Sequence, residues 1–488
     1  MKYSLTSEKP AERRNFLKYA ATAIVCGVVA GVGGYFGGAA AVPAGVETTV
    51  TKTIGGAGET VTATKTVTGP ATTVTKTVGE EIPAPEGAPI KLGYQNDLTG
   101  MLDLFGRSQD VGFHSAVDYV NELGGIDGRP VEAITEDTEG KADIGMEKFR
   151  KMVLEDGCVA IMGSTSSGIV TASLPLAKEF KIPYLSVGAM SHRLTGGTPG
   201  REGFTDVGNR WHFRLVSQVA TQVAGYKEYG FEHIGKKWST MYWDYSWGQS
   251  HDYMWTEAAD EYGGEIVSHI PIPLGTADFY PYAAKIPPEA EAVYPVLLGA
   301  ASIGYLTSIH ESGYDRELGF VICLLDGIEA ETLAEIVEGC WTIEYYPREL
   351  EGCKATGMGP ETDFYRERCR IDEHGFIQPE GWMATNSHTW PAWENVFMMK
   401  EAIENTGWKS AADNELIIKY LEDDLMLKRS KAYPLGDGWL RKEDHQGLFP
   451  HWISKLDSNG RVEVVEKLPV SKIAYPVPKG VDYSTQEL

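Results

Sequence analysis

The sequence predicts an α/β protein with two lobes, each a doubly wound parallel sheet covered by helices. Short apolar runs alternate with stretches of helical spacing from residue 90 onward. The alternation breaks at an irregular segment, residues 191–212, and then starts again, which indicates a second lobe. The chain has 488 residues, enough for about two or three domains with large cores.

In the first series, apolar runs predict strands and the amphipathic stretches between them predict helices. The expected strands cover residues 90–97, 129–137, 158–163 and 182–188. The expected helices cover residues 108–125, 141–156 and 169–181, and a Gly-containing loop is expected at 98–106. Because the connections are short, the strands should run parallel with helices on both faces of the sheet.

The second series predicts a second sheet and further elements near the C-terminus. Its expected strands cover residues 238–244, 265–273, 292–300 and 319–327, and a helix covers residues 248–264. Residues 388–406 read as a helix with aromatic and Met residues on one side, which we interpret as core. Residues 439–457 and 462–468 are strand-like and are joined by the turn signal at residues 457–460.

The N-terminus predicts export from the cytoplasm. Residues 13–18 read RRNFLK and residues 19–46 carry no charge, which together resemble a twin-arginine signal within residues 1–46. The alternative is a membrane anchor whose basic flank stays inside. Both interpretations place the rest of the chain outside the cytoplasm. Cys26 follows the bulky Val25, which disfavours lipidation.

Residues 47–89 predict a stalk. TTVTKT occurs at 48–53 and again at 72–77, and no amphipathic pattern is present that could build a core. Thr-rich, Pro-containing tracts of this kind are typically extended. The alternation of Thr and Val is also compatible with β-structure, although it would lack a packing face.

Charge and cysteine content exclude some functions and leave others open. The formal net charge is -24, so a non-specific nucleic-acid binder is not expected. The six cysteines show no CxxC spacing, and no metal or cofactor is expected. Cys340, Cys353 and Cys369 lie close enough in sequence for one disulfide in an oxidising compartment; the alternative is buried free thiols.

The stretch MGSTSSG, residues 162–168, is the clearest candidate binding loop. It follows an expected strand and precedes a helix, whose N-terminus favours an anion. Ile169 and Val170 stand where a phosphate-binding loop needs Lys and a hydroxyl residue. A G-x-S-x-G nucleophile elbow is also missing. The loop therefore predicts a cradle for a carboxylate or another planar polar group, or simply helix capping by Ser167.

Several segments together resemble one protein family over about residues 90–470. They are VNELGGIDGRPVE at 120–132, GSTSSG at 163–168, DYSWGQS at 244–250, TADFYPY at 276–282, LDG at 325–327 and RKEDHQ at 441–446. They resemble the type I periplasmic binding proteins that serve branched-chain amino-acid ABC transporters. The resemblance implies a type I fold, with two lobes joined by a three-segment hinge that closes on a ligand.

The resemblance also implies positions for ligand contacts. In the first lobe, Ser166 and Ser167 would hold a ligand carboxylate and Asp326, after a later strand, would meet its ammonium group. Aromatic residues before glycines would cover the ligand. The full implied set is Phe105, Ser166, Ser167, Gly188, Ala189, Met190, Tyr245, Trp247 and Asp326. Two departures leave the specificity open: Met190 replaces a small hydroxyl residue, and residues 195–212 form an unfamiliar insertion.

The implied organisation assigns every part of the chain. Lobe 1 would comprise residues 90–212 and 348–436, lobe 2 residues 213–347 and 437–470, and a tail residues 471–488. The implied function is extracytoplasmic capture of an amino acid or related solute by a monomer that delivers it to a membrane permease. A ligand-sensing receptor on the same fold is the alternative. An enzyme is not expected, because His445 is the best candidate for chemistry and lies in a strand-linking segment.

Overall fold

The computed structural model describes residues 47–53, 60–66, 84–198, 201–314, 318–323, 330–384 and 386–488. The chain divides into two compact units, Met1–Glu81 and Ile82–Leu488. In the first unit, β1 (Glu47–Thr53) pairs with β2 (Thr60–Thr66) in antiparallel register, so part of the predicted stalk is β-structure. The predicted export signal and Cys26 lie outside the described residues.

A five-stranded parallel sheet organises the first lobe. Its order is β4-β3-β5-β6-β7, so the chain starts in the middle and builds outward in both directions. The strands are β3 (Ile90–Asn96), β4 (Val131–Asp137), β5 (Ala160–Gly163), β6 (Tyr184–Ser186) and β7 (His212–Arg214). The first four match the predicted strands. β7 runs across the predicted lobe boundary at residues 212/213.

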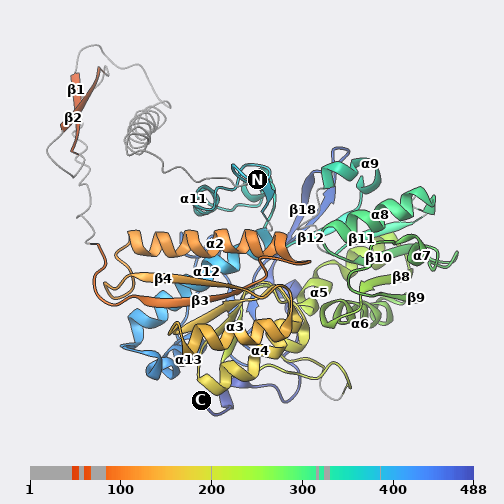
Figure 1. Ribbon diagram of the computed structural model, residues 1–488. Coiled ribbons are helices and arrows are strands. Elements are labelled where there is room, and N and C mark those ends of the chain that lie inside the picture. The colour runs from red at the N-terminus through yellow and green to blue at the C-terminus, as the bar shows by residue number, and fades with distance from the viewer. Residues whose placement is uncertain are drawn as a thin grey trace, which may run out of the picture. The chain divides into compact units, whose positions relative to one another are not determined.

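Helices cover both faces of this sheet, as predicted (Figure 1). One face carries α2 (Asp103–Glu122) and α12 (Asn386–Thr406), which pack together. The other carries α3 (Ala142–Leu154) and α4 (Ser167–Phe180). Helix α2 begins at Asp103, inside the segment predicted as a loop. It buries Phe113, Ala116, Val117 and Val120, the helical-spaced apolar residues that predicted it.

A seven-stranded sheet organises the second lobe. Its order is β18-β17-β12-β11-β10-β8-β9, parallel from β9 to β12 and antiparallel from β12 to β18. The strands are β8 (Lys237–Trp243), β9 (Glu265–Ile272), β10 (Ala292–Val296), β11 (Gly319–Ile322), β12 (Trp341–Glu344), β17 (His451–Leu456) and β18 (Val462–Leu468). The predicted turn at residues 457–460 joins the last two.

The remaining elements surround the two sheets. In the second lobe they are α5 (Val219–Tyr229), η2 (Gly230–Ile234), α6 (Ser246–Tyr262), α7 (Tyr280–Ala283), α8 (Ala300–Glu311), η4 (Ala330–Leu333), α9 (Ala334–Val337) and α14 (Val470–Ile473). Beside the first sheet and the crossings are η1 (His192–Leu194), α10 (Leu350–Ala355), α11 (Pro360–Arg368), β13 (Phe376–Ile377), β14 (Trp382–Met383), η5 (Ala411–Asp413), α13 (Asn414–Asp423), β15 (Trp439–Leu440), β16 (Gly447–Leu448) and η6 (Tyr483–Thr485).

The two lobes have separate hydrophobic cores. The chain passes between the sheets after β7, after β12 and before β17. Cys158, Cys323, Cys340, Cys353 and Cys369 are all buried free thiols, so the structure contains no disulfide among Cys340, Cys353 and Cys369. Each is kept as a thiol by burial, which raises its pKa.

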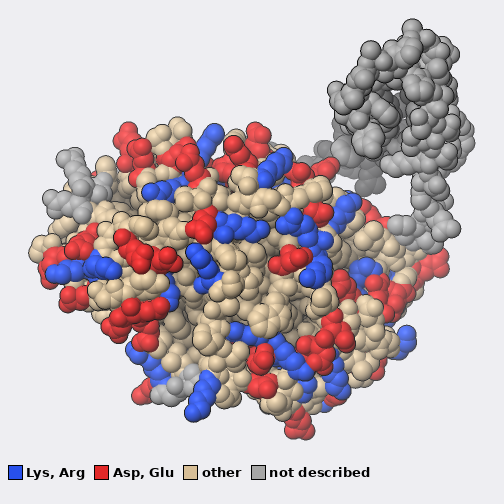
Figure 2. Space-filling view, turned by 180° about the vertical axis from the view of Figure 1, so that it is seen from behind, with Lys and Arg blue, Asp and Glu red and all other residues tan. Residues whose placement is uncertain are grey.

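The surface of the described unit mixes charges of both signs. Figure 2 shows Lys and Arg interspersed with Asp and Glu over the face in view, without an extended basic patch. Within the described residues, no group of His, Cys, Asp and Glu side chains is arranged to hold a metal ion. Among the same residues, no helix has the length and apolarity needed to cross a membrane.

Candidate functional site

The MGSTSSG loop leads from β5 into α4, at the carboxyl edge of the first sheet. Gly163 has φ +106° and a Cβ there would clash with the carbonyl oxygen of Gln95, so the turn requires glycine. Ser166 caps α4, its Oγ accepting from the Ile169 N–H at 3.4 Å. The N–H groups of Ser167 and Gly168 have no hydrogen-bond partner within the described part of the chain.

Asp97, at the end of β3, lies beneath this loop and binds it. Its carboxylate accepts from Ser164 Oγ at 2.6 Å, from the Thr165 N–H at 2.8 Å and from the Ser166 N–H at 3.4 Å; the Thr138 hydroxyl donates to its other oxygen. Burial raises the pKa of Asp97, although these hydrogen bonds act in the opposite direction and lower it. Two backbone donors of the predicted cradle, the N–H groups of Thr165 and Ser166, thus bind an internal carboxylate, and the role of the loop as a ligand cradle stays a prediction that depends on the first N–H groups of α4.

The loop after β6, whose backbone is predicted to contact the ligand, makes several hydrogen bonds inside the protein. The Gly188 N–H donates to Ser164 O at 3.3 Å. The carbonyls of Ala189 and Met190 accept from Arg214 Nη1 at 3.0 Å and from the Val219 N–H at 2.9 Å. Met190 is buried in the core of the second lobe. These contacts place Gly188, Ala189 and Met190 beside the MGSTSSG loop and use the Gly188 N–H and the carbonyls of the other two residues.

Gln109, which sequence reasoning missed, supplies a free donor at the same place. The side chain is fully buried on α2, and its Oε1 accepts from Tyr94 Oη at 2.7 Å and from Thr165 Oγ1 at 3.1 Å. Its Nε2 has no partner in the described residues. A Cβ on Gly188 would lie 2.7 Å from that nitrogen, so the amide lies against this glycine. A glutamine inside a helix gave no sequence signal for this role.

The predicted aromatic residues come from both lobes. Phe105 is buried on α2 and packs edge-on against His388, with ring centroids 5.0 Å apart. Tyr245 is the N-cap residue of α6 and Trp247 lies in its first turn; their rings are 6.1 Å apart. Trp247 is buried, and its indole N–H has no partner among the described residues. Burial, aided by the charge of Asp97, raises the pKa of Tyr245.

The two lobes meet directly beside these residues. Ser191, after the Gly188–Met190 loop, contacts Ser246 Oγ and Ser250 Oγ of α6 at 3.0 Å each, and its N–H donates to Ser167 Oγ at 3.1 Å. Phe105 packs in the core of the second lobe with Met190 and Trp247. The structure thus brings together all the predicted site residues except Asp326, which lies outside the described residues.

Comparison with known proteins identifies the family. A family model described as periplasmic binding protein matches residues 89–461. The chain belongs to this family. Among curated relatives of this periplasmic binding protein is Leu/Ile/Val-binding protein homolog 4 of Brucella abortus, which is 23% identical over 395 residues, spanning 77% of this chain and 86% of the relative.

Solved structures of periplasmic binding proteins share the fold. One from Burkholderia mallei gives a TM-score of 0.66 at 16% identity and covers 81% of this chain and 98% of its own. The branched-chain amino acid transporter substrate binding protein of Streptococcus pneumoniae, in complex with isoleucine, gives 0.62 at 18% identity over 78% of this chain and 100% of its own. A solute binding protein of R. palustris, in complex with benzoate, gives 0.66 at 15% identity over 82% and 100%. The predicted type I fold is confirmed.

His445, the residue that the sequence offered as the best candidate for chemistry, packs inside this periplasmic binding protein. Its ring is buried and stacks on Phe213 at 4.0 Å, Nδ1 lies 3.0 Å from His212 O, and Nε2 lies 3.2 Å from Glu422 Oε1. Both nitrogens are therefore used in packing β7 against α13. Periplasmic binding proteins are solute-binding proteins that work outside the cytoplasm, which is the compartment that the sequence predicted.

Proposed function

We propose that this protein is the solute receptor of an ABC importer. It captures an amino acid or a related small carboxylate between its lobes and delivers it, as a monomer, to a membrane permease. The observation that carries the proposal is the set of unused hydrogen-bond donors at the start of α4. The N–H groups of Ser167 and Gly168 and the Gln109 amide nitrogen can each donate a hydrogen bond, and none of them has an acceptor among the described residues.

The chemistry of these donors favours an anion. The first N–H groups of a helix and its dipole stabilise negative charge, and a buried amide N–H left without a partner costs about 1–3 kcal/mol. A ligand carboxylate would accept hydrogen bonds both from the first N–H groups of α4 and from the Gln109 amide. Phe105, Tyr245 and Trp247 would pack against the rest of the ligand, because aromatic rings bury apolar surface and still tolerate polar neighbours.

The similar proteins support this class of ligand. Their names and titles mention Leu/Ile/Val binding, isoleucine and benzoate. All these compounds carry a carboxylate, and only the amino acids carry an ammonium group. We propose that Asp326 binds that ammonium group. The choice between amino acids and simple acids then depends on this one residue.

Thermal unfolding of the full chain against matched ligand pairs tests the proposal. Each pair consists of an amino acid and the carboxylic acid that lacks its amino group. A binding solute should raise the melting temperature, because only the folded state binds it. Asp326→Asn should weaken the binding of the amino acids and leave the binding of the paired acids unchanged. If no carboxylate stabilises the protein, the proposal is wrong.

Gln109→Glu provides the sharper test of the donor set. It keeps the shape and the Oε1 acceptor but replaces the free donor with a carboxylate oxygen, which would repel a ligand carboxylate. We expect affinity to fall at least about tenfold at pH 7. Gln249→Glu, the same change on the exposed side of α6, is the matched control and should bind normally. Equal affinities of the two variants would remove Gln109 from the site.

A further inference from the structure

The unfamiliar insertion contacts the second lobe. We use the name insertion here for residues 192–198 and 201–208, between β6 and β7, which start three residues before the predicted bounds of 195–212 and end before β7. Arg201 lies above the ring of Tyr253 on α6, with its guanidinium carbon 4.0 Å from the ring centroid. Phe204 packs against the same tyrosine at 4.9 Å, and the His192 ring stacks on it at 6.0 Å. Three first-lobe side chains thus surround one second-lobe tyrosine, which is only 8% exposed.

This contact lies on the helix that carries the aromatic part of the candidate site. Tyr253 follows Tyr245 and Trp247 along α6, and the Ser191 hydroxyl contacts Ser246 and Ser250 on the same helix. The insertion therefore holds α6 against the first lobe. When the lobes move apart, Tyr253 must leave Arg201 and Phe204, and the cation–π and ring contacts are lost.

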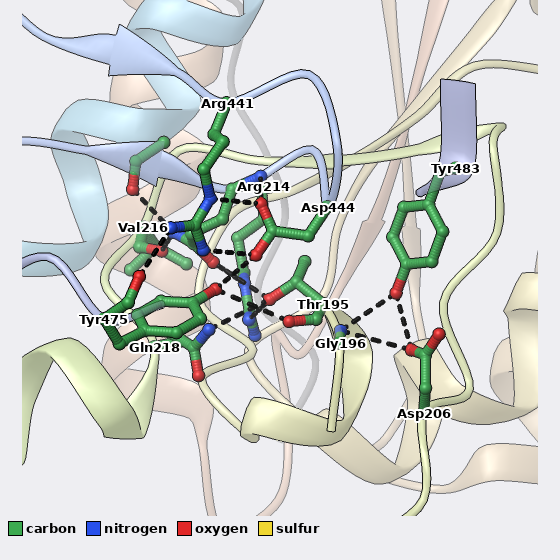
Figure 3. Close-up of polar contacts among 12 residues, drawn as sticks. Thr195, Gly196, Asp206, Arg214, Val216, Gln218, Arg441, Asp444, Tyr475 and Tyr483 are labelled. Carbon is green, nitrogen blue, oxygen red and sulfur yellow. Dashed lines mark hydrogen bonds and ion pairs between the residues drawn. The ribbon is translucent and has the colours of Figure 1, made fainter. Parts of the chain in front are cut away.

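The base of the insertion is fixed by the C-terminal end of the chain (Figure 3). The Tyr483 hydroxyl donates to Asp206 at 2.5 Å and accepts from the Gly196 N–H at 2.9 Å. The Asp206 carboxylate also accepts from the N–H groups of Gly196 at 3.2 Å and of Gly208 at 2.9 Å. A Cβ on Gly208 would clash with the Tyr483 hydroxyl, so the insertion is shaped to receive this tyrosine.

A second tyrosine, Tyr475, also attaches the C-terminal segment to the rest of the protein. The Tyr475 hydroxyl donates to Asp444 at 2.6 Å, and Arg441 makes two bonds to that carboxylate at 2.8 and 2.5 Å. Arg441 also donates to the Tyr475 carbonyl at 2.6 Å and lies over its ring. Asp444 and Arg441 are both buried. The ion pair and the tyrosine therefore form one satisfied unit next to the crossing into β17.

This C-terminal strap, residues 474–488, crosses from one lobe to the other. It follows α14, whose Ile473 packs in the core of the second lobe. At its far end the Gln486 carbonyl accepts from Arg210 at 2.6 Å and Leu488 packs against the core of the first lobe. Figure 1 places the C-terminus beside α13. The strap lies beyond the family match, which stops at residue 461.

We propose that the strap and the insertion act together as an interlobe clasp that slows separation of the two lobes and release of the solute. The strap fixes the insertion to the first lobe, and Arg201 and Phe204 hold Tyr253 of the second lobe. Arg201 is a positioning residue, because it acts on α6 and not on the ligand. The effect on release rests on the proposed function, whereas the effect on opening does not.

Interlobe distances measured with spin labels test the clasp without any ligand. Leu154→Cys and Leu274→Cys introduce labels at exposed positions of the two lobes; the described native cysteines are buried, and Cys26→Ser removes the remaining one. Arg201→Ala in the full chain should shift the distances to longer values. Arg150→Ala, an exposed arginine of α3, is the control and should leave them unchanged. An unchanged distribution in the Arg201 variant would overturn the clasp.

Removing the whole strap could unfold the protein, so its role is tested by a substitution that deletes a single oxygen atom. Tyr483→Phe deletes the hydroxyl that binds Asp206 and Gly196, and it should lengthen the interlobe distances; Tyr280→Phe, on an exposed tyrosine, should not. If the strap acts through the insertion, Arg201→Ala and Tyr483→Phe together should open the lobes no further than Arg201→Ala alone. Additive shifts would overturn the link between strap and insertion.

With a bound solute, Arg201→Ala should release it about tenfold faster at a nearly unchanged association rate, as expected for one partly buried cation–π contact. An unchanged release rate together with longer distances would show that the clasp opens the lobes without controlling release, and would refute that part of the proposal. Failure to find any solute would count against the proposed function alone.

Discussion

Asp97 offers the most direct test of how the candidate site is built. The carboxylate is fully buried and receives four hydrogen bonds, three of them from the loop that leads into α4. If Asp97 organises this loop, Asp97→Ala should destabilise the protein much more than Asp97→Asn. The two substitutions remove the same charge, so the difference between them reports the lost hydrogen bonds together with the small cavity that alanine leaves.

The magnitude follows from which donors lose their acceptor. In Asp97→Ala the Thr165 N–H keeps no partner among the residues that the structure describes, whereas the Ser166 N–H keeps Ser164 Oγ at 3.0 Å. One orphaned buried N–H together with a small cavity should lower the unfolding free energy by about 2–4 kcal/mol. In Asp97→Asn the amide oxygen still accepts from the loop and the amide nitrogen faces the Thr138 hydroxyl, which can turn to accept. We expect a loss below about 1 kcal/mol.

Urea unfolding followed by circular dichroism, with ligand titration of both variants, measures these effects. Asp97→Asn should retain solute affinity, because the loop keeps its shape. Equal destabilisation by the two variants would refute the hydrogen-bond argument. A stable Asp97→Asn protein that no longer binds solute would instead show that Asp97 contacts the ligand directly.

Two further predictions concern pH. Burial lowers the pKa of His251 to about 3, as it does for His192, so the folded state loses stability as the pH falls from about 6.5 toward 3. For His251 alone the loss at pH 5 is about 2 kcal/mol, and His251→Gln should flatten the pH dependence of urea unfolding. Although burial opposes it, bonding to His445 and Arg210 lowers the pKa of Glu422 to about 2. Above about pH 4.5 the charged Glu422 contributes stability of order 3 kcal/mol, and this contribution should be lost as the pH falls from about 4.5 to 2. Glu422→Gln has no carboxyl group to titrate and should not show this loss.

The fold could be predicted because its signals are local. Each strand of the first sheet is an apolar run, and α2 carries its buried residues at helical spacing over Phe113, Ala116, Val117 and Val120. The start of α2 at Asp103 was missed. Gly106 and the polar residues around it suggested a loop, but a Cβ on Gly106 would clash with the carbonyl of Asp97. That glycine is needed for close packing of the helix, not for a turn.

The contacts that build the candidate site could not be predicted in the same way, because they are not local. Composition and position identify the MGSTSSG loop as a candidate, but the residues that bind it come from distant parts of the chain. Nothing in the sequence around Asp97 or Gln109 connects them to Thr165, and both bonds depend on how β3, α2 and β5 lie together. The strap was likewise invisible, because Tyr483 finds Asp206 only after the whole fold has formed.

A buried carboxylate below the proposed anion site at the start of α4 looks contradictory, since Asp97 should repel a ligand carboxylate. The geometry resolves it. Asp97 accepts from the N–H groups of Thr165 and Ser166, whereas those of Ser167 and Gly168, which open α4, have no partner in the described part of the chain. The loop is thus ordered before the solute arrives, so binding does not have to supply the entropy of ordering it. The cost appears in Asp97 itself, whose raised pKa shows that burial disfavours its charged form.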